Sequence, residues 1–117
     1  VRTILNLLRD FPIKSIAHIT GGGLMENIPR VLPHGCKALI NSSSWQWPPI
    51  FQLLQDAGGI ETNEMYRTFN CGIGMVLAVP EKELEEILIR LSGLNEEARV
   101  IGDVAKCEVG KENVEFC

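Results

Sequence analysis

The sequence predicts an α/β or α+β fold in which helices pack against a small mixed β-sheet. Segments with helical periodicity alternate with short apolar runs of strand character along the 117 residues. Their order is helix, strand, helix, strand, two helices, strand, helix, strand, strand, which is typical of a layered domain that combines both kinds of element. With 45% hydrophobic residues the chain can bury one core, so we expect residues 1–117 to form a single domain.

An amphipathic helix is predicted at the start of the chain. Apolar residues recur there at helical spacing until Pro12 ends the pattern: Val1, Ile4, Leu5, Leu8 and Phe11. No Ser, Thr, Asp or Asn precedes Val1 as a cap, so we expect Val1 to lie inside a helix and the natural polypeptide to continue upstream.

Short strands and helices separated by glycine and proline are predicted for the middle of the chain. The predicted strands cover 13–20 and 37–40, and a polar and aromatic loop covers 41–49. The predicted helices cover 24–32, interrupted at Pro29; 50–57, ended by Gly58 and Gly59; and 61–68.

The last third predicts a strand, a helix and two more strands. Alternating residues over 71–79 favour a strand packed on both faces, where Gly72 and Gly74 leave one face bare. From Pro80 to Gly93 an apolar stripe indicates a helix supported by a Glu86/Arg90 pair, its members being Leu84, Ile87, Leu88 and Leu91. The final strands are predicted at 99–107 and 114–116, around a turn at Gly110.

Charge and cysteine usage exclude several classes of protein. A net charge of -4 argues against a general nucleic-acid binder. Residues 81–117 carry -5 and residues 1–80 carry +1, so an anionic ligand is expected in the first two thirds. No apolar run approaches the roughly 20 residues of a membrane span, and we expect a cytoplasmic protein with no membrane partner. Four cysteines without a C-x-x-C pair predict neither a metal site nor a disulfide framework, and Cys71, in an apolar run, is expected to be buried and unreactive.

The segment from His18 to Gly23 is the first candidate for chemistry. Three glycines (Gly21, Gly22, Gly23) stand where a strand gives way to a helix, and such a turn allows backbone N–H groups to approach an anion. It has no Walker-type Lys-Ser/Thr, and the alternative is a tight turn that needs positive φ angles. His18 has a charge that changes near neutral pH, although a structural hydrogen bond is the other interpretation.

Further polar residues lie near this segment or near the second pair of glycines. Asn27 and Arg30 are one helical turn apart and are expected to project toward the same ligand, unless they belong to an exposed polar face. Arg67 and Asn70 precede Gly72 and Gly74, whose bare strand face admits a ligand or tight packing. Two tryptophans, at 45 and 47, would stack on a base or anchor a long loop, and we favour the anchor.

Three motifs together resemble a known family. The segments 17–33 (AHITGGGLMENIPRVLP), 44–48 (SWQWP) and 64–75 (EMYRTFNCGIGM) are similar in order and spacing to the C-terminal domain of aminoimidazole ribonucleotide synthetases. The resemblance runs from the first helix to Gly102, and it implies that the chain is most of that domain. From about Lys106 onward no segment carries it.

The resemblance implies an ATP-dependent ring closure in purine biosynthesis. ATP would phosphorylate the formyl amide oxygen of formylglycinamidine ribonucleotide, and the amidine nitrogen would attack the activated carbon with release of ADP and phosphate. ATP and Mg²⁺ are expected to bind mainly to an N-terminal domain that this chain lacks and that also forms a homodimer; the chain itself is expected to hold no metal and to be inactive alone.

The resemblance also implies roles for the candidate residues. The glycine turn would face the cleft between the domains and hold a phosphate, most simply that of the ribonucleotide. His18 is the catalytic candidate, and the substrate-binding candidates are Thr20, Gly21, Gly22, Gly23, Asn27, Arg30, Arg67, Asn70, Gly72 and Gly74. Two alternatives stay open, namely another enzyme of the same superfamily (formylglycinamidine ribonucleotide synthetase or selenophosphate synthetase) and a non-catalytic phosphate-binding module.

Overall fold

The computed structural model describes residues 2–116 and combines helices with two small β-sheets. The α-helices are α1 (Arg2–Asp10), α2 (Gly23–Asn27), α3 (Pro49–Gly58), α4 (Thr62–Thr68) and α5 (Leu84–Gly93). Short 3₁₀ turns are η1 (Pro29–Val31), η2 (Ser42–Ser44) and η3 (Glu81–Glu83). The strands are β1 (Ser15–His18), β2 (Cys36–Ile40), β3 (Met75–Ala78), β4 (Gly102–Lys106) and β5 (Val114–Phe116). This confirms the predicted α+β class.

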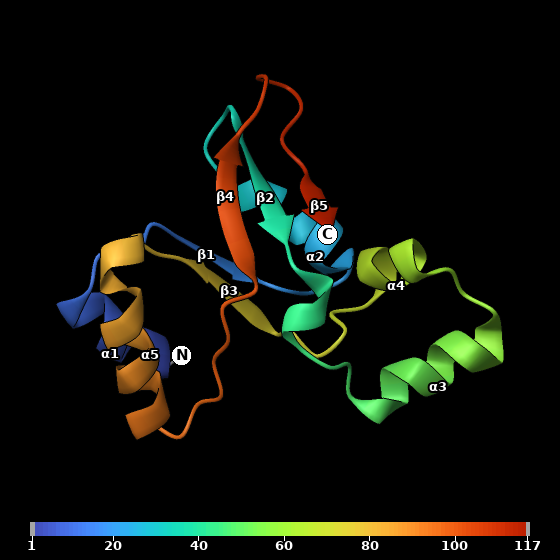
Figure 1. The fold of residues 1–117 in the computed structure, drawn as a ribbon, viewed down its shortest axis with the longest axis horizontal. Coiled ribbons are helices and arrows are strands. Elements are labelled where there is room, and N and C mark those ends of the chain that lie inside the picture. Colours follow the sequence, from blue (N-terminus) through green and yellow to red (C-terminus); the bar gives the residue numbers. More distant parts are fainter. Residues whose placement is uncertain (1, 117) are drawn as a thin grey trace.

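The strands divide between two sheets, whereas the sequence predicted one. β1 and β3 form an antiparallel two-stranded sheet in which His18 lies opposite Met75. In the other sheet β2 lies between β4 and β5, antiparallel to β4 and parallel to β5, so this sheet is mixed. Figure 1 shows the three-stranded sheet standing above the two-stranded one, with α1 and α5 on one side and α3 and α4 on the other.

Helices α1 and α5 cover one end of the two-stranded sheet. Leu7, Ile87 and Leu91 form the buried centre of this layer, and Leu77 and Val79 pack against it. The backbone of α1 ends at Asp10, ahead of Pro12 as predicted, and the helical hydrogen bond from Phe11 to Leu7 is its last. The predicted start at Val1 lies outside the described residues.

Arg90 links these two helices and does not form the predicted pair with Glu86. Its guanidinium donates to the Asn6 side chain and to the Asp10 carboxylate, both at 2.8 Å, and lies over the Phe11 ring. The hydrogen bond from Arg90 lowers the pKa of the Asp10 carboxyl. Arg90 therefore bonds across to α1 rather than along its own helix.

The main core lies between α2, α4 and the three-stranded sheet. Tyr66 of α4 is at its centre: its ring stacks on Phe116 at 4.1 Å between centroids, and Trp45 and Trp47 meet it edge-on. The indole N–H of Trp45 donates to the Cys71 carbonyl at 3.0 Å. The tryptophans therefore anchor their loop to the core, as the sequence favoured.

Several predicted elements are shorter in the structure. The predicted helix at 24–32 is split at Pro29 into α2 and η1, as expected. β1 covers only the middle of 13–20, and β4 begins at Gly102 rather than at 99. The predicted strand 71–79 begins only at Met75, because residues 70–73 turn instead.

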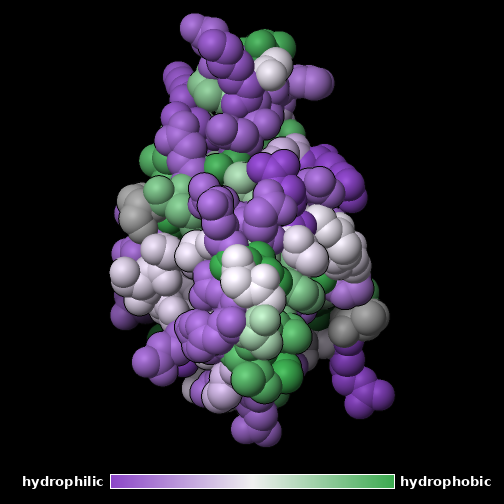
Figure 2. Space-filling view, turned by 90° about the vertical axis from the view of Figure 1, so that its right-hand side faces the viewer, coloured by the Kyte–Doolittle hydropathy of each residue, from purple (hydrophilic) through white to green (hydrophobic). Residues whose placement is uncertain are grey.

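The molecule is open for its size. Its accessible surface of 7629 Å² is about a fifth larger than the roughly 6,300 Å² expected of a compact monomer of this mass. Helix α3 projects away from both sheets (Figure 1), and Figure 2 shows apolar side chains gathered on the face that it presents. Ile50, Leu53 and Leu54 of α3 are exposed there.

Candidate functional site

The glycine turn joins the end of β1 to α2 and is built around positive φ angles. Gly22 has φ 97° and Gly23 has φ 60°, and the Gly23 N–H donates to the Thr20 carbonyl at 3.0 Å. A Cβ atom on Gly23 would collide with the carbonyls of Tyr66 and Phe69. Glycine at 23 is therefore required by close approach to α4 as well as by its φ angle.

The turn leaves hydrogen-bond donors free. Within residues 2–116, the backbone N–H groups of Gly21 and Gly22 make no hydrogen bond. Gly21 is exposed, as is the neighbouring Thr20, and a Cβ atom on Gly21 would meet nothing within 4 Å. The outer side of the turn can therefore receive an acceptor group from a ligand.

Asn27 supports the turn from inside and does not face a ligand. Only 6% of the residue is exposed. Its side-chain amide donates to the carbonyls of Gly23 at 2.8 Å and of Thr20 and Gly21 at 3.3 Å each. Its oxygen accepts from the Thr20 hydroxyl at 3.3 Å and from Arg30 at 3.4 Å. The expectation that Asn27 and Arg30 reach out together is therefore wrong for Asn27, whose polar atoms are used within the turn.

Arg30 is a cation beside the turn, where it contacts Asn27, and it has an acidic neighbour. It lies in η1 with its side chain 64% exposed, and its guanidinium is 4.0 Å from the Glu26 carboxylate. Glu26 in turn folds back against Gly22, where a Cβ atom would collide with it. An anionic ligand at the turn would therefore compete with Glu26 for Arg30.

His18 lies at the end of β1, exposed and opposite Met75. Its side chain makes no hydrogen bond or ion pair with any residue between 2 and 116, so the structural hydrogen bond considered for it is not found there. It borders a groove on the two-stranded sheet rather than the glycine turn.

The second group of candidates follows α4. Arg67 is exposed and pairs with Glu64 at 3.6 Å. The Asn70 side chain accepts from the Gly72 N–H at 2.9 Å, and Cys71 and Gly72 both have positive φ, 50° and 96°. Gly72 therefore belongs to a turn and not to a strand face, which corrects the expectation.

Tight packing explains why residue 72 is a glycine, whereas position 74 has space for a side chain. A Cβ atom on Gly72 would collide with the Pro48 ring at 2.6 Å, whereas one on Gly74 would meet nothing within 4 Å. The Gly74 carbonyl accepts from the Ile19 N–H at 2.9 Å and so extends the pairing of β1 with β3.

The two groups of candidates meet where α4 packs on the glycine turn. Gly23 touches the carbonyls of Tyr66 and Phe69, and Arg67 and Asn70 are the next residues in sequence. The structure thus brings segments 20–30 and 67–70 together, and it places His18, Gly72 and Gly74 along the groove.

Cys71 is buried at the base of this arrangement, as predicted. The residue has no exposed surface, and its thiol lies 3.5 Å from the Met65 carbonyl. Burial raises the pKa of the Cys71 thiol to about 11, so it carries no thiolate near neutral pH.

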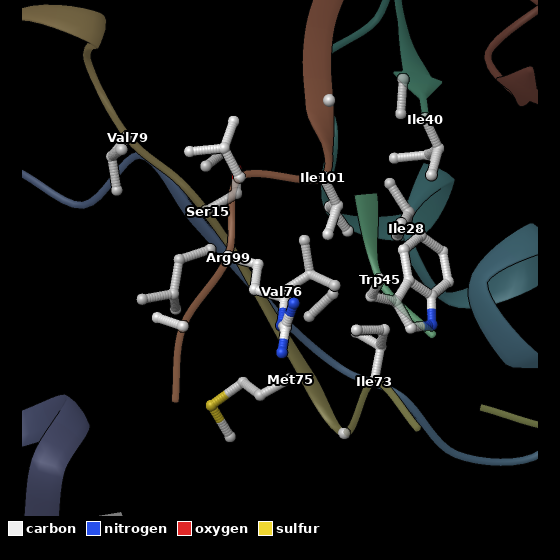
Figure 3. A pocket seen from close by; sticks show the side chains of 18 of the residues that line it. Ser15, Ile28, Ile40, Trp45, Ile73, Met75, Val76, Val79, Arg99 and Ile101 are labelled. Atoms are coloured by element: carbon white, nitrogen blue, oxygen red, sulfur yellow. The ribbon is translucent and has the colours of Figure 1, made fainter. Parts of the chain in front are cut away.

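The groove along which His18, Gly72 and Gly74 lie was not itself predicted from the sequence. It has a volume of about 1090 Å³ and is bounded by the two-stranded sheet, by α1 and α5, and by the extended residues 96–101. We call residues 96–101 the crossing segment, because they pass over β1 and β3 to reach β4 (Figure 3). Apolar side chains dominate the lining, among them Ile73, Met75, Val76, Val79 and Ile101.

The part of the chain that the structure describes offers neither a metal cluster nor a membrane span. Among residues 2–116, no three His, Cys, Asp or Glu side chains are grouped so that they could hold a metal ion. None of the helices from α1 to α5 has the length and apolar character needed to cross a membrane.

Comparison with known proteins identifies the family of this chain. Residues 1–115 match the family model described as AIR synthase related protein, C-terminal domain. A phosphoribosylformylglycinamidine cyclo-ligase of Geotalea uraniireducens (strain Rf4) is 76% identical over 116 residues, which are 99% of this chain and 33% of that protein. The protein of the same name from Geobacter sulfurreducens (strain ATCC 51573 / DSM 12127 / PCA) is 70% identical over 116 residues, with the same shares covered. The chain thus spans about a third of the length of these curated relatives.

Proposed function

Since the chain belongs to the AIR synthase related family as its C-terminal domain, we propose that it is the C-terminal part of a phosphoribosylformylglycinamidine cyclo-ligase. The observation that carries this proposal is the identity of 70–76% with proteins of that name, over almost the whole chain. That name favours the cyclo-ligase over the two other superfamily enzymes and over a stand-alone phosphate-binding module.

The proposed reaction closes an imidazole ring at the expense of ATP. The formyl amide oxygen of formylglycinamidine ribonucleotide takes the γ-phosphoryl group of ATP, which leaves ADP. The amidine nitrogen then forms a bond to the activated carbon, the C–O bond to phosphate breaks, and loss of a proton gives aminoimidazole ribonucleotide. Mg²⁺ would neutralise charge on the transferring phosphoryl group. As the family resemblance implies, we place the metal ligands and most of the ATP site in the rest of the full-length protein, together with its homodimer contacts. We also propose that the full-length protein is cytoplasmic.

The residues of this chain would bind the substrate. We assign the ribonucleotide phosphate to the outer side of the glycine turn, where the N–H groups of Gly21 and Gly22 are available. The exposed Thr20 hydroxyl would leave Asn27 and donate to the same phosphate. Arg30 would leave Glu26 and pair with the phosphate. Asn27 would hold the turn in shape, whereas Arg67, Asn70, Gly72 and Gly74 would border the substrate from the α4 side.

His18 is proposed as the proton-transfer group of the site. Its exposed imidazole makes no hydrogen bond or ion pair within residues 2–116, so it is available to a substrate.

The phosphate assignment is tested by two opposite changes in the full-length protein. Arg30→Ala should raise the KM for formylglycinamidine ribonucleotide by roughly tenfold or more, which corresponds to about 1.4 kcal/mol for a charge-assisted hydrogen bond. Glu26→Gln should lower the same KM, because it removes the anion that competes for Arg30. Arg9→Ala, on the exposed side of α1, is the matched control and should leave the KM unchanged. An unchanged KM in Arg30→Ala would remove Arg30 from the site.

Activity itself is tested on both lengths of chain. The full-length protein should form ADP in a manner that depends on the ribonucleotide, and the 117-residue chain, purified free of contaminants, should not. Turnover by the short chain would contradict the division of labour proposed here.

Direct binding is tested by titrating the short chain with the ribonucleotide and following amide chemical shifts. Shifts centred on residues 21–30 would support the phosphate site. Shifts elsewhere, with none at the turn, would speak against it.

A further inference from the structure

The groove on the two-stranded sheet is large and apolar, and it is not matched to a small ligand. Its volume of about 1090 Å³ exceeds the upper end of the range typical of ligand pockets, roughly 1,000 Å³. Met75, Val100 and Val104 expose 40%, 48% and 51% of their surface along it. Such an extended apolar surface marks a contact with another piece of polypeptide.

The sheet that forms the groove is incomplete by itself. Among residues 2–116 it consists of β1 and β3, each of four residues, so within that range each strand has one edge without a neighbouring strand. Two-stranded sheets are marginal unless a helix or further strands cover them. Helices α1 and α5 cover only one end, because Leu77 and Val79 are packed while Met75 and His18 are exposed.

The crossing segment also lacks packing. Every residue from 92 to 100 is exposed, and residues 96–101 belong to neither a helix nor a strand. The molecule as a whole exposes about a fifth more surface than a compact protein of its mass. The surplus is of the size that an interface between domains of one chain buries, about 600–1,500 Å².

The position of α1 identifies what occupies the groove. Thr3 and Ile4, close to the first described residue, line it, and Figure 1 shows α1 beside α5 at the same end of the molecule. Relatives of this chain are about three times as long. A segment joined to α1 would reach the groove within a few residues, and this linkage gives it an effective concentration in the millimolar range that a second copy of the chain does not have.

We propose that the groove is the seat of the polypeptide that precedes α1 in the full-length protein, and that this polypeptide covers Met75 and the crossing segment. The inference rests on the proposed function, because it takes the chain to be the C-terminal part of a longer ligase. It assigns the part of the groove around Met75 and the crossing segment to an intramolecular contact. It leaves the glycine turn, beyond the end of β1, to the substrate, with His18 and Gly74 at the border between the two.

Methionine oxidation tests this contact without altering the groove. Met75 is 40% exposed whereas Met65 is 0% exposed, so peroxide should oxidise Met75 readily in the 117-residue chain and leave Met65 intact. In the full-length protein the oxidation of Met75 should be at least tenfold slower. A Val109→Met variant supplies the matched control, because Val109 is 76% exposed and lies outside the groove; the oxidation rate of the introduced methionine should agree within about twofold in the two lengths of chain.

The outcomes separate the possible occupants. The proposal would be overturned if Met75 were oxidised at the same rate in both lengths of chain. It would also be overturned if the full-length protein slowed the oxidation of Met75 and of the methionine introduced at position 109 by the same factor. A second copy of the chain is the other possible occupant. In that case Met75 oxidation in the short chain would become slower as the protein concentration rises, and it would be no slower in the full-length protein. This result would also overturn the proposal. Within the full-length V109M protein alone, Met75 should react at about one tenth of the rate of the introduced methionine, so the test does not depend on the stability of the short chain.

The same preparations distinguish this inference from the proposed function. A full-length protein that closes the ring but leaves Met75 reactive overturns the groove assignment alone. One that shields Met75 but has no ligase activity overturns the proposed function alone.

Discussion

Removing the side chain of Asn27 should weaken the fold through the glycine turn. Asn27→Ala takes away the donor to the buried Gly23 carbonyl at 2.8 Å and the longer bonds to the carbonyls of Thr20 and Gly21 at 3.3 Å. A hydrogen bond contributes about 0.5–1.5 kcal/mol net, and a buried carbonyl left without a partner costs about 1–3 kcal/mol. Because two of the three bonds are long and only partly buried, we expect a loss of about 2–4 kcal/mol in the free energy of unfolding.

Urea denaturation followed by tryptophan fluorescence measures this loss. Trp45 is buried in the core next to α4, so its emission should report unfolding. With an m-value of about 1.5 kcal/mol/M, the midpoint should fall by roughly 1.3–2.7 M. Asn63→Ala is the matched control, because Asn63 is exposed on α4 and its side chain makes no hydrogen bond within residues 2–116. It should change stability by no more than about 0.5 kcal/mol.

The result that would refute the reasoning is a loss below about 1 kcal/mol for Asn27→Ala. The carbonyls of the turn would then be satisfied without the Asn27 amide, and Asn27 would be free to face a ligand as the sequence first suggested. Asn27→Asp sharpens the test, since it keeps the shape but replaces the donor with a carboxylate beside the same carbonyls. It should be at least as destabilising as Asn27→Ala above neutral pH.

Three further predictions concern backbone space, thiol chemistry and pH. Gly23→Ala should cost at least about 3 kcal/mol in the urea assay, because its φ of 60° and the adjacent carbonyls exclude a Cβ atom, whereas Gly21→Ala should be nearly neutral; equal midpoints would contradict this. A thiol reagent at pH 8 should leave Cys71 unmodified until the chain unfolds, since burial raises its pKa to about 11, and rapid modification in the folded protein, read by mass mapping, would contradict its burial. The Gly35 N–H, as the main cause, lowers the pKa of Glu112 below its ordinary 4.5, so its stabilising contribution is present above that value and is lost as pH falls through the lowered pKa. Glu112→Gln should therefore flatten the acid side of the stability profile while Glu108→Gln, an exposed control, should not.

The elements best predicted from the sequence are those whose signal is local. Pro12 ends α1, Pro29 splits α2 from η1, and Gly93 ends α5, as the sequence indicated. In each case a ring without an N–H, or a residue without a Cβ, acts on its own segment. The family resemblance was also local, since it rested on three short motifs, and the matched family confirms it.

What failed was set by contacts that hydrophobic periodicity does not encode, some of them local and some between segments distant in the chain. The alternation over 71–79 predicted one strand, but the Asn70 side chain accepts a hydrogen bond from the Gly72 N–H and forms a turn there. Cys71 in this turn has φ 50°, which is uncommon for a residue other than glycine and is not predicted by the sequence pattern. Arg90 bonds to Asn6 and Asp10 because α1 lies beside α5, which periodicity within one helix does not reveal. The groove likewise depends on how residues 3–4, 73–79 and 96–104 are placed together.

The three family motifs meet at Tyr66, and the packing around this residue fixes the shape of the glycine turn. Tyr66 stacks on Phe116 and is met edge-on by Trp45 and Trp47, so α4 is held firmly in the core. The carbonyl of the same Tyr66 faces Gly23 at closest approach, and Asn27 holds the opposite side of the turn. A turn fixed on both sides by packing need not become ordered when a phosphate binds, so little conformational entropy is lost at that step. The same rigidity means that substitutions in the tryptophan motif should alter the turn through α4, although the tryptophans themselves make no contact with the substrate in the proposed site.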